Sequence, residues 1–199
     1  MRALQLASVL AAAACFIAVD GCAHLTNGSV PSVTPTPTPS ATPLSAACNQ
    51  TAAANAQIVA ISPLITPVID PTYGLISGYG LATTGSSSNV AATIVVAPTA
   101  AVQFFNNDQS TSQLRYSAVG IPGVTTFPGP TFTFPPSTVT QTGTQINATS
   151  SWSTGLLPGQ CYSQVFTISA AGVYFFGDYT YYALGNIRDV IVATSSPGL

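Results

Sequence analysis

Residues 155–192 read GLLPGQCYSQVFTISAAGVYFFGDYTYYALGNIRDVIV, and this stretch decides the fold class of the chain. The runs 163–168 and 172–176 are rich in β-branched and aromatic residues, which is typical of short, partly buried strands. A third such run, 187–193, follows the segment GDYTYYALG. Strands of this length, separated by Gly, Pro and Asn, predict an all-β antiparallel sandwich with Greek-key connections rather than a sheet crossed by helices.

The same pattern continues upstream to about residue 48. We expect further strands at 57–61, 76–82, 90–96, 101–106, 114–119 and 145–152. Only residues 46–60 have room for a helical turn. The segment 120–140 is rich in Pro and Phe, and it lacks too many amide donors for a central strand. It is therefore predicted to be a long loop.

Two chain reversals connect these strands. The turn at Pro98 and Thr99 and the turn at 170–172 are interpreted as the bends of two hairpins. In the strand that follows Pro98, alternation places Val102 and Phe104 inward and Gln103 outward.

Charge is scarce along the whole chain. Charged residues make up 4%, the net charge is −2, and neither Lys nor Glu occurs. So few cations do not neutralise a phosphate backbone, and binding to nucleic acid is not expected. The hydrophobic share of 47% is enough to bury a core. A surface made of uncharged polar residues suits an exported protein.

The N-terminus also indicates export. A single Arg precedes an apolar run from Ala3 to Val19, which is shorter than the ~20 residues of a membrane-spanning helix and typical of a secretory signal. The segment Val19-Asp20-Gly21-Cys22 resembles the lipobox of bacterial lipoproteins, in which cleavage exposes a Cys that carries a diacylglycerol. The resemblance implies a signal peptide at 1–21 and lipidation of Cys22. An ordinary signal peptide beside an unmodified Cys22 is the alternative.

Residues 22–47 are rich in Ser, Thr and Pro, and alternate Thr-Pro near their centre. Such a segment is predicted to be an extended tether, followed by one domain at 48–199. We expect a cell-envelope location, attached to a bacterial membrane by the lipid and facing the periplasm or exterior; without the lipid the protein is secreted.

Cys48 and Cys161 are the two cysteines of the expected domain. An even pair in an exported domain predicts a disulfide. The alternative of two reactive thiols has no neighbouring Lys or His in the sequence to lower a thiol pKa.

Residues 93–192 contain two motifs that resemble cupredoxins, the Greek-key sandwiches of blue-copper proteins. TIVVAPTAAVQFFNNDQST (93–111) resembles their strand, turn and Val-x-Phe-x-Asn-x-Asp segment. STGLLPGQCYSQVFTISAAGVYFF (153–176) resembles their Gly-Leu-Leu-x-Pro-Gly-Gln segment, alternating strand and Gly-x-Tyr-x-Phe ending. The resemblance implies a cupredoxin-like fold.

The resemblance also places the copper ligands. It implies a first His near Ser112, a Cys near Gly177 or Asp178, a second His near Tyr181 and a Met near Leu184. None of these residues supplies the imidazole or thiolate that a blue-copper site requires. We therefore expect no type-1 copper and no cofactor. The alternative is an electron-transfer protein with unrecognised copper ligands, for example His24 behind a free amine at Cys22.

The residues around the vacated ligand positions are interpreted in two ways. They form a contact surface, or they fill the space of the former metal pocket; the set is Ser112, Asp178, Tyr179, Tyr181, Tyr182 and Leu184. Asp108 is expected in a turn, and Asp189 is expected to form a surface pair with Arg188.

No enzyme is expected. The domain has no His, so a Ser-His-Asp triad is absent, although the scattered carboxylates leave a glycosidase pair open. Three function classes remain: a module that binds an envelope protein or a glycan, a structural envelope component, and the copper protein with other ligands.

Overall fold

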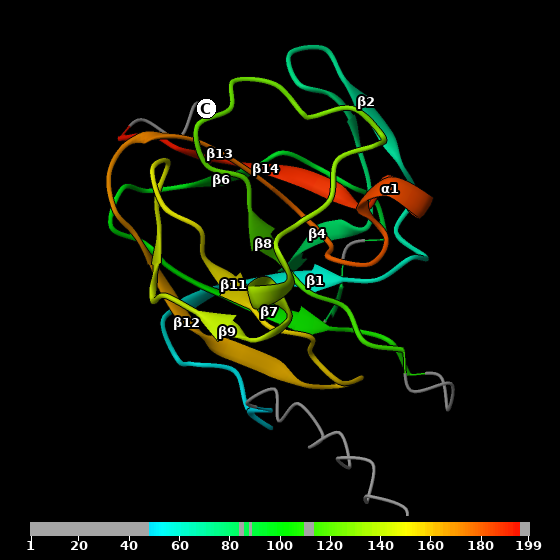
Figure 1. Cartoon of the computed structure of the whole chain (residues 1–199). Coiled ribbons are helices and arrows are strands. Elements are labelled where there is room, and N and C mark those ends of the chain that lie inside the picture. The colour runs from blue at the N-terminus through cyan, green and yellow to red at the C-terminus, as the bar shows by residue number, and fades with distance from the viewer. Residues whose placement is uncertain (1–47, 84–85, 88, 110–113, 196–199) are drawn as a thin grey trace, which may run out of the picture. The chain divides into compact units, whose positions relative to one another are not determined.

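The computed structural model describes residues 48–83, 86–87, 89–109 and 114–195 (Figure 1). The expected signal peptide, the tether with Cys22 and His24, and Ser112 lie outside the described residues. No helix in the described part of the chain is long and apolar enough to cross a membrane.

The described residues form two six-stranded sheets and one small hairpin. The first sheet has the strand order β10-β12-β7-β1-β4-β5. In that order its strands span Gln145–Ile146, Tyr162–Ile168, Ala101–Asn106, Ala56–Ile61, Tyr79–Thr83 and Ser86–Ser87.

The second sheet has the order β6-β14-β13-β8-β11-β9. Its strands span Ile94–Val96, Arg188–Ala193, Gly172–Gly177, Val119–Gly120, Ser153–Thr154 and Gln141–Thr142. The hairpin pairs β2 (Val68–Asp70) with β3 (Gly74–Ile76). The helical elements among the described residues are a single turn, α1 (Tyr182–Gly185), and the 3-10 helix η1 (Pro136–Val139).

This architecture confirms the expected all-β sandwich, with two differences in strand pairing. The pairs β1–β7, β10–β12 and β14–β6 are parallel, so both sheets are mixed rather than antiparallel. The two expected hairpins are also wrong, because β6 and β7 lie in different sheets, as do β12 and β13. Their turns are corners at which the chain crosses from one sheet to the other.

The strand boundaries agree best where alternation is strongest. β7 matches the expected 101–106, and β12, β13 and β14 lie within one residue of the expected bounds. Two expected strands are much shorter in the structure. Of 114–119 only the last residue lies in a strand, β8 (Val119–Gly120), and of 145–152 only the first two residues do, in β10 (Gln145–Ile146). Within the expected strand 145–152, Asn147 Oδ1 accepts hydrogen bonds from the backbone amides of Thr149 and Ser150 and forms a turn.

The helical turn expected within 46–60 does not form in the described residues 48–60. β1 begins at Ala56, and the preceding segment contacts β12 and β7. Asn49 bridges Tyr162, and the amide of Ala53 donates to Oε1 of Gln103 at 2.8 Å. Gln103, which was expected to face outward, is buried, and its Nε2 donates to Ser163 O.

The main core lies between the two sheets. Fully buried aromatic rings fill its centre: Phe104 stacks on Trp152 with centroids 5.7 Å apart, and Tyr79 meets Phe176 edge-on at 4.6 Å. Gly120 is required at this point, because a Cβ there would overlap the indole of Trp152.

A second apolar layer covers the outer face of the second sheet. Residues 121–135 cross this face without regular strands, which confirms the predicted loop. Phe134 packs against Tyr182 at 5.6 Å, and Phe127 meets Phe175 at 5.0 Å. The guanidinium of Arg188 lies 4.8 Å from the ring centroid of Phe127, so the loop is held by aromatic contacts and a cation–π contact.

Candidate binding site at the loop end of the sandwich

Several connections gather at the end of the sandwich where β1 and β7 finish (Figure 1). The amide of Asn107 donates to Ile61 O, and the amide of Ser62 donates to Gly78 O. β13 ends and β14 begins at the same end, because Gly177 pairs with Arg188 and Arg188 bridges Ser77. We call this the loop end; it contains residues 62–67, 107–109 and 178–187.

At the loop end, Asp178 connects two segments of the chain through hydrogen bonds to its carboxylate. Its Oδ1 accepts from the amides of Thr180 and Tyr181 at 2.8 and 2.7 Å. Its Oδ2 accepts from the amide of Ser117 at 2.7 Å and from the hydroxyl of Ser117 at 3.2 Å. The same hydroxyl accepts from the amide of Tyr179 at 2.8 Å. One carboxylate therefore fixes the first residues after β13 onto the segment that leads to β8.

The side chain of Asp178 is completely buried. Burial raises its pKa, and the hydrogen bonds from Ser117, Tyr181 and Thr180 oppose that rise. Both oxygens are occupied by donors from the chain itself, as in a turn-capping Asp. Asp178 stands near the position where the cupredoxin resemblance implies a thiolate, and a hydrogen-bonded carboxylate does not fit a blue-copper ion there.

The three tyrosines after Asp178 occupy different environments. Tyr182 is buried, and its hydroxyl donates to Pro128 O at 2.8 Å. Tyr181 is half-buried and packs on Tyr116 with centroids 5.4 Å apart, and Tyr179 is also half-buried. Leu184 is 81% exposed. Leu184 therefore fills no interior space, whereas Tyr182 and part of Tyr181 do.

The local backbone explains why this loop turns so tightly. A Cβ at Gly177 would lie 2.5 Å from the ring of Tyr182, so only glycine permits Tyr182 to fold over the end of β13. α1 then ends at Asn186, whose φ of 51° is left-handed. The chain is returned to β14 within one helical turn.

Asp189 does not form the expected surface pair with Arg188. The two are neighbours in β14, and neighbouring strand residues face opposite sides of a sheet. Arg188 points to the outer layer, where its Nε donates to Leu75 O at 3.2 Å. Asp189 is fully buried in the sheet interior, and its Oδ2 has no hydrogen-bond partner. Burial raises the pKa of Asp189 well above its ordinary value.

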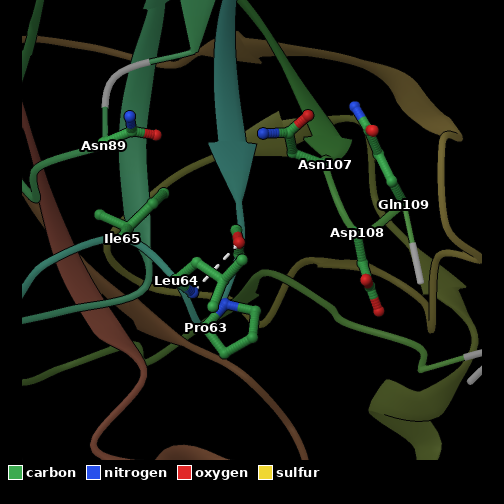
Figure 2. A pocket seen from close by; sticks show the side chains of 8 residues that line it. Pro63, Leu64, Ile65, Asn89, Asn107, Asp108 and Gln109 are labelled. Atoms are coloured by element: carbon green, nitrogen blue, oxygen red, sulfur yellow. Dashed lines mark hydrogen bonds between the residues drawn. The ribbon is translucent and has the colours of Figure 1, made fainter.

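An open cavity of about 300 Å³ lies at the loop end (Figure 2). Its lining combines amides, one hydroxyl, one carboxylate and three apolar side chains: Asn89, Asn107, Gln109, Ser62, Asp108, Pro63, Leu64 and Ile65. Leu64 is 86% exposed at its rim. In Figure 2, Asn89 stands on one side of the end of β1 and Asn107, Asp108 and Gln109 stand on the other.

The cavity is the feature that sequence reasoning missed. Its walls come from segments near residues 62, 89 and 107, which approach one another only through sheet pairing. A signal was present in the consecutive polar residues 107–109, which directly follow the strand β7. Of the expected site residues, Asp178, Tyr179, Tyr181, Tyr182 and Leu184 share the loop end with the cavity, and none of them lines it.

Within the described ranges, no three His, Cys, Asp or Glu side chains are grouped closely enough to hold a metal ion. No family model matches the chain, and no curated protein matches it. Among solved structures, the chain is similar to auracyanin B, a cupredoxin, with a TM-score of 0.37 and 12% sequence identity. The similarity covers 72% of this chain and 93% of the other, and it concerns the fold alone.

Proposed function

We propose that this chain is an exported, lipid-anchored β-sandwich module that binds an envelope component through its loop end, without type-1 copper and without enzymatic activity. The observation that carries the proposal is the open cavity beside the exposed Leu64. Concave sites with a few convergent polar groups are the usual binding sites of small domains. In the full protein, residues 22–47 act as the tether and lipidated Cys22 as the anchor.

The disulfide supports the exported location. Cys48 and Cys161 are bonded, with their Cα atoms 5.0 Å apart, which confirms the predicted bridge. Disulfides of this kind persist in oxidising compartments and are rare in the cytosol. The N-terminal sequence and the scarcity of charge point to the same location.

The chemistry of the loop end supports the metal-free and non-catalytic parts of the proposal. Both carboxylate oxygens of Asp178 accept hydrogen bonds from the chain. Tyr181 and Leu184 supply a phenol and a hydrocarbon at positions where a copper site needs an imidazole and a thioether. The part of the cavity lining that the structure describes includes one carboxylate, Asp108, and no His. A paired acid and base for hydrolysis is therefore not assembled in it.

Lipid attachment is tested by metabolic labelling with a palmitate analogue. We expect the wild type to be labelled and Cys22→Ser to be unlabelled. Equal labelling of the two proteins contradicts the anchor.

Binding at the loop end is tested by using the immobilised protein to capture its binding partner from envelope fractions. The wild-type chain is compared with Leu64→Asp, which places a charge at the cavity rim without disturbing the core. Val165→Asp is the matched control, because Val165 is an exposed apolar residue on β12. We expect capture to be lost in Leu64→Asp alone; capture that is equal in all three proteins overturns the proposed site.

A further inference from the structure

The polar groups of the cavity are mostly neutral, and they both donate and accept hydrogen bonds. Side-chain amides come from Asn89, Asn107 and Gln109, and a hydroxyl comes from Ser62. An amide offers an N–H donor and a carbonyl acceptor side by side. This pairing matches adjacent hydroxyl groups of a ligand, each of which also donates and accepts.

The described lining of the cavity favours a neutral ligand over an anion. Among the described residues that line the cavity there is no Arg or His, and Asp108 contributes a carboxylate. These residues supply no cation to pair with a phosphate, sulfate or uronate, so a neutral ligand is favoured.

The apolar part of the rim is a small, fixed surface. The amide of Leu64 donates to Ser62 Oγ at 3.2 Å (Figure 2), and the amide of Ile65 donates to Ser62 O at 3.2 Å. Pro63 restricts the backbone within this turn. Leu64 and Pro63 are exposed, and they present an apolar surface suited to the C–H face of a ring whose hydroxyls lie at its edge.

The cavity walls are pre-organised. The backbone N–H of Asn107 donates to Ile61 O, and the backbone N–H of Asp108 donates to Oδ1 of the buried Asn106. On the other wall, the amide of Thr66 donates to Asn89 O at 2.7 Å. These bonds fix the backbone of the cavity walls, which lowers the conformational cost of binding a small ligand.

We propose that this cavity binds one ring of a neutral saccharide, with its hydroxyls on Asn89 and Gln109 and its apolar face on Leu64. The volume of about 300 Å³ stands at the lower end of small-ligand sites, which suits a single ring of a longer glycan. The inference rests on the proposed function of the loop end and names the chemistry of its ligand.

The test is a glycan microarray probed with the full-length chain in detergent. We expect binding to neutral hexose or N-acetylhexosamine glycans and none to sulfated or uronate-rich glycans. The double variant Asn89→Ala/Gln109→Ala removes two exposed amides and should weaken binding about tenfold or more. Gln141→Ala, which removes an exposed amide on β9, should bind like the wild type. No bound glycan, a preference for acidic glycans, or unchanged binding by the double variant overturns the proposal.

Capture from envelope fractions separates this inference from the proposed function. The fractions are treated with periodate, which cleaves vicinal diols and destroys saccharide rings. Loss of capture after treatment supports the saccharide. Capture that survives treatment but still depends on Leu64 overturns the saccharide and leaves the loop end as a binding site for another ligand. If the wild type and Leu64→Asp capture equal amounts of partner from untreated fractions, both proposals are overturned.

Discussion

Ser117 donates both its amide and its hydroxyl to one carboxylate oxygen of Asp178, at 2.7 and 3.2 Å. The two residues are 61 positions apart in the chain. Through this contact, the loop after β13 and the segment leading to β8 are fixed together at the loop end. The arrangement places a structural carboxylate at the centre of a region that the sequence alone associated with metal ligands.

Asp178→Ala is expected to destabilise the domain strongly. The substitution leaves the amides of Ser117, Thr180 and Tyr181 without their acceptor. Each unsatisfied buried donor costs about 1–3 kcal/mol, so we expect a loss of about 3 kcal/mol in the free energy of unfolding. Urea denaturation followed by tryptophan fluorescence measures it. Ser137→Ala, at an exposed position in η1, is the control and should change stability by less than about 0.5 kcal/mol.

The buried carboxyl of Asp189 is expected to make stability depend on pH. Its folded-state pKa is raised by burial, so the protonated form is favoured in the fold. Its contribution to stability is therefore complete below its unfolded-state pKa of about 4 and declines as the pH rises through the raised folded-state pKa.

Asp189→Asn mimics the protonated form and cannot ionise. We expect the variant to gain stability relative to the wild type as the pH is raised from 4 to 8, with the smallest difference at pH 4. Thermal melts across this range measure the two curves. Curves that stay parallel would show that Asp189 does not titrate differently in the folded and unfolded chains.

Removal of the Cys48–Cys161 bridge is expected to destabilise the domain. The bridge joins residues 113 positions apart, and in the chain-entropy model a loop of that length contributes about 4–5 kcal/mol. The double variant Cys48→Ser/Cys161→Ser should therefore melt at a markedly lower temperature. Intact mass after thiol alkylation, with and without reduction, checks the bridge itself; two alkylated domain cysteines in the unreduced protein contradict it.

Three substitutions in the β13–β14 connection should have graded effects on stability. Tyr182 is 1% exposed within an aromatic cluster, and Tyr182→Ala should cost about 3–5 kcal/mol. Tyr181→Ala removes a half-buried ring from Tyr116 and should cost less. Leu184→Ala, at an exposed position, should change stability by less than about 0.5 kcal/mol. Equal losses at Tyr182 and Leu184 are incompatible with the observed packing.

Local alternation was sufficient to predict individual strands but not their partners. The bounds of β7 were predicted correctly because Val102 and Phe104 alternate with their neighbours and a polar run ends the strand. The turn signal at Pro98 indicated only a change of direction. Whether the next strand pairs with the previous one or crosses to the other sheet depends on β14 and β1, which are distant in sequence.

The site was only partly predictable for the same reason. Asp178 was singled out, but its role depends on Ser117, which no local pattern connects to it. The buried position of Asp189 was within reach of sequence reasoning, because strand parity separates it from Arg188. The cavity was not, since Ser62, Asn89 and Asn107 meet only in the folded sheets.

We expect residues 48–195 to hold no copper tightly. A blue-copper ion takes its binding energy from a deprotonated thiol and neutral imidazoles. The domain has no His; Cys48 and Cys161 are bonded to each other, and the oxygens of Asp178 are occupied by chain donors. Calorimetric titration of the full-length His24→Ala chain with Cu(II) and Cu(I) tests this, with unaltered full-length protein reporting any binding at the N-terminus. Binding of one equivalent with a sub-micromolar Kd and a thiolate charge-transfer band in His24→Ala would falsify the metal-free assignment.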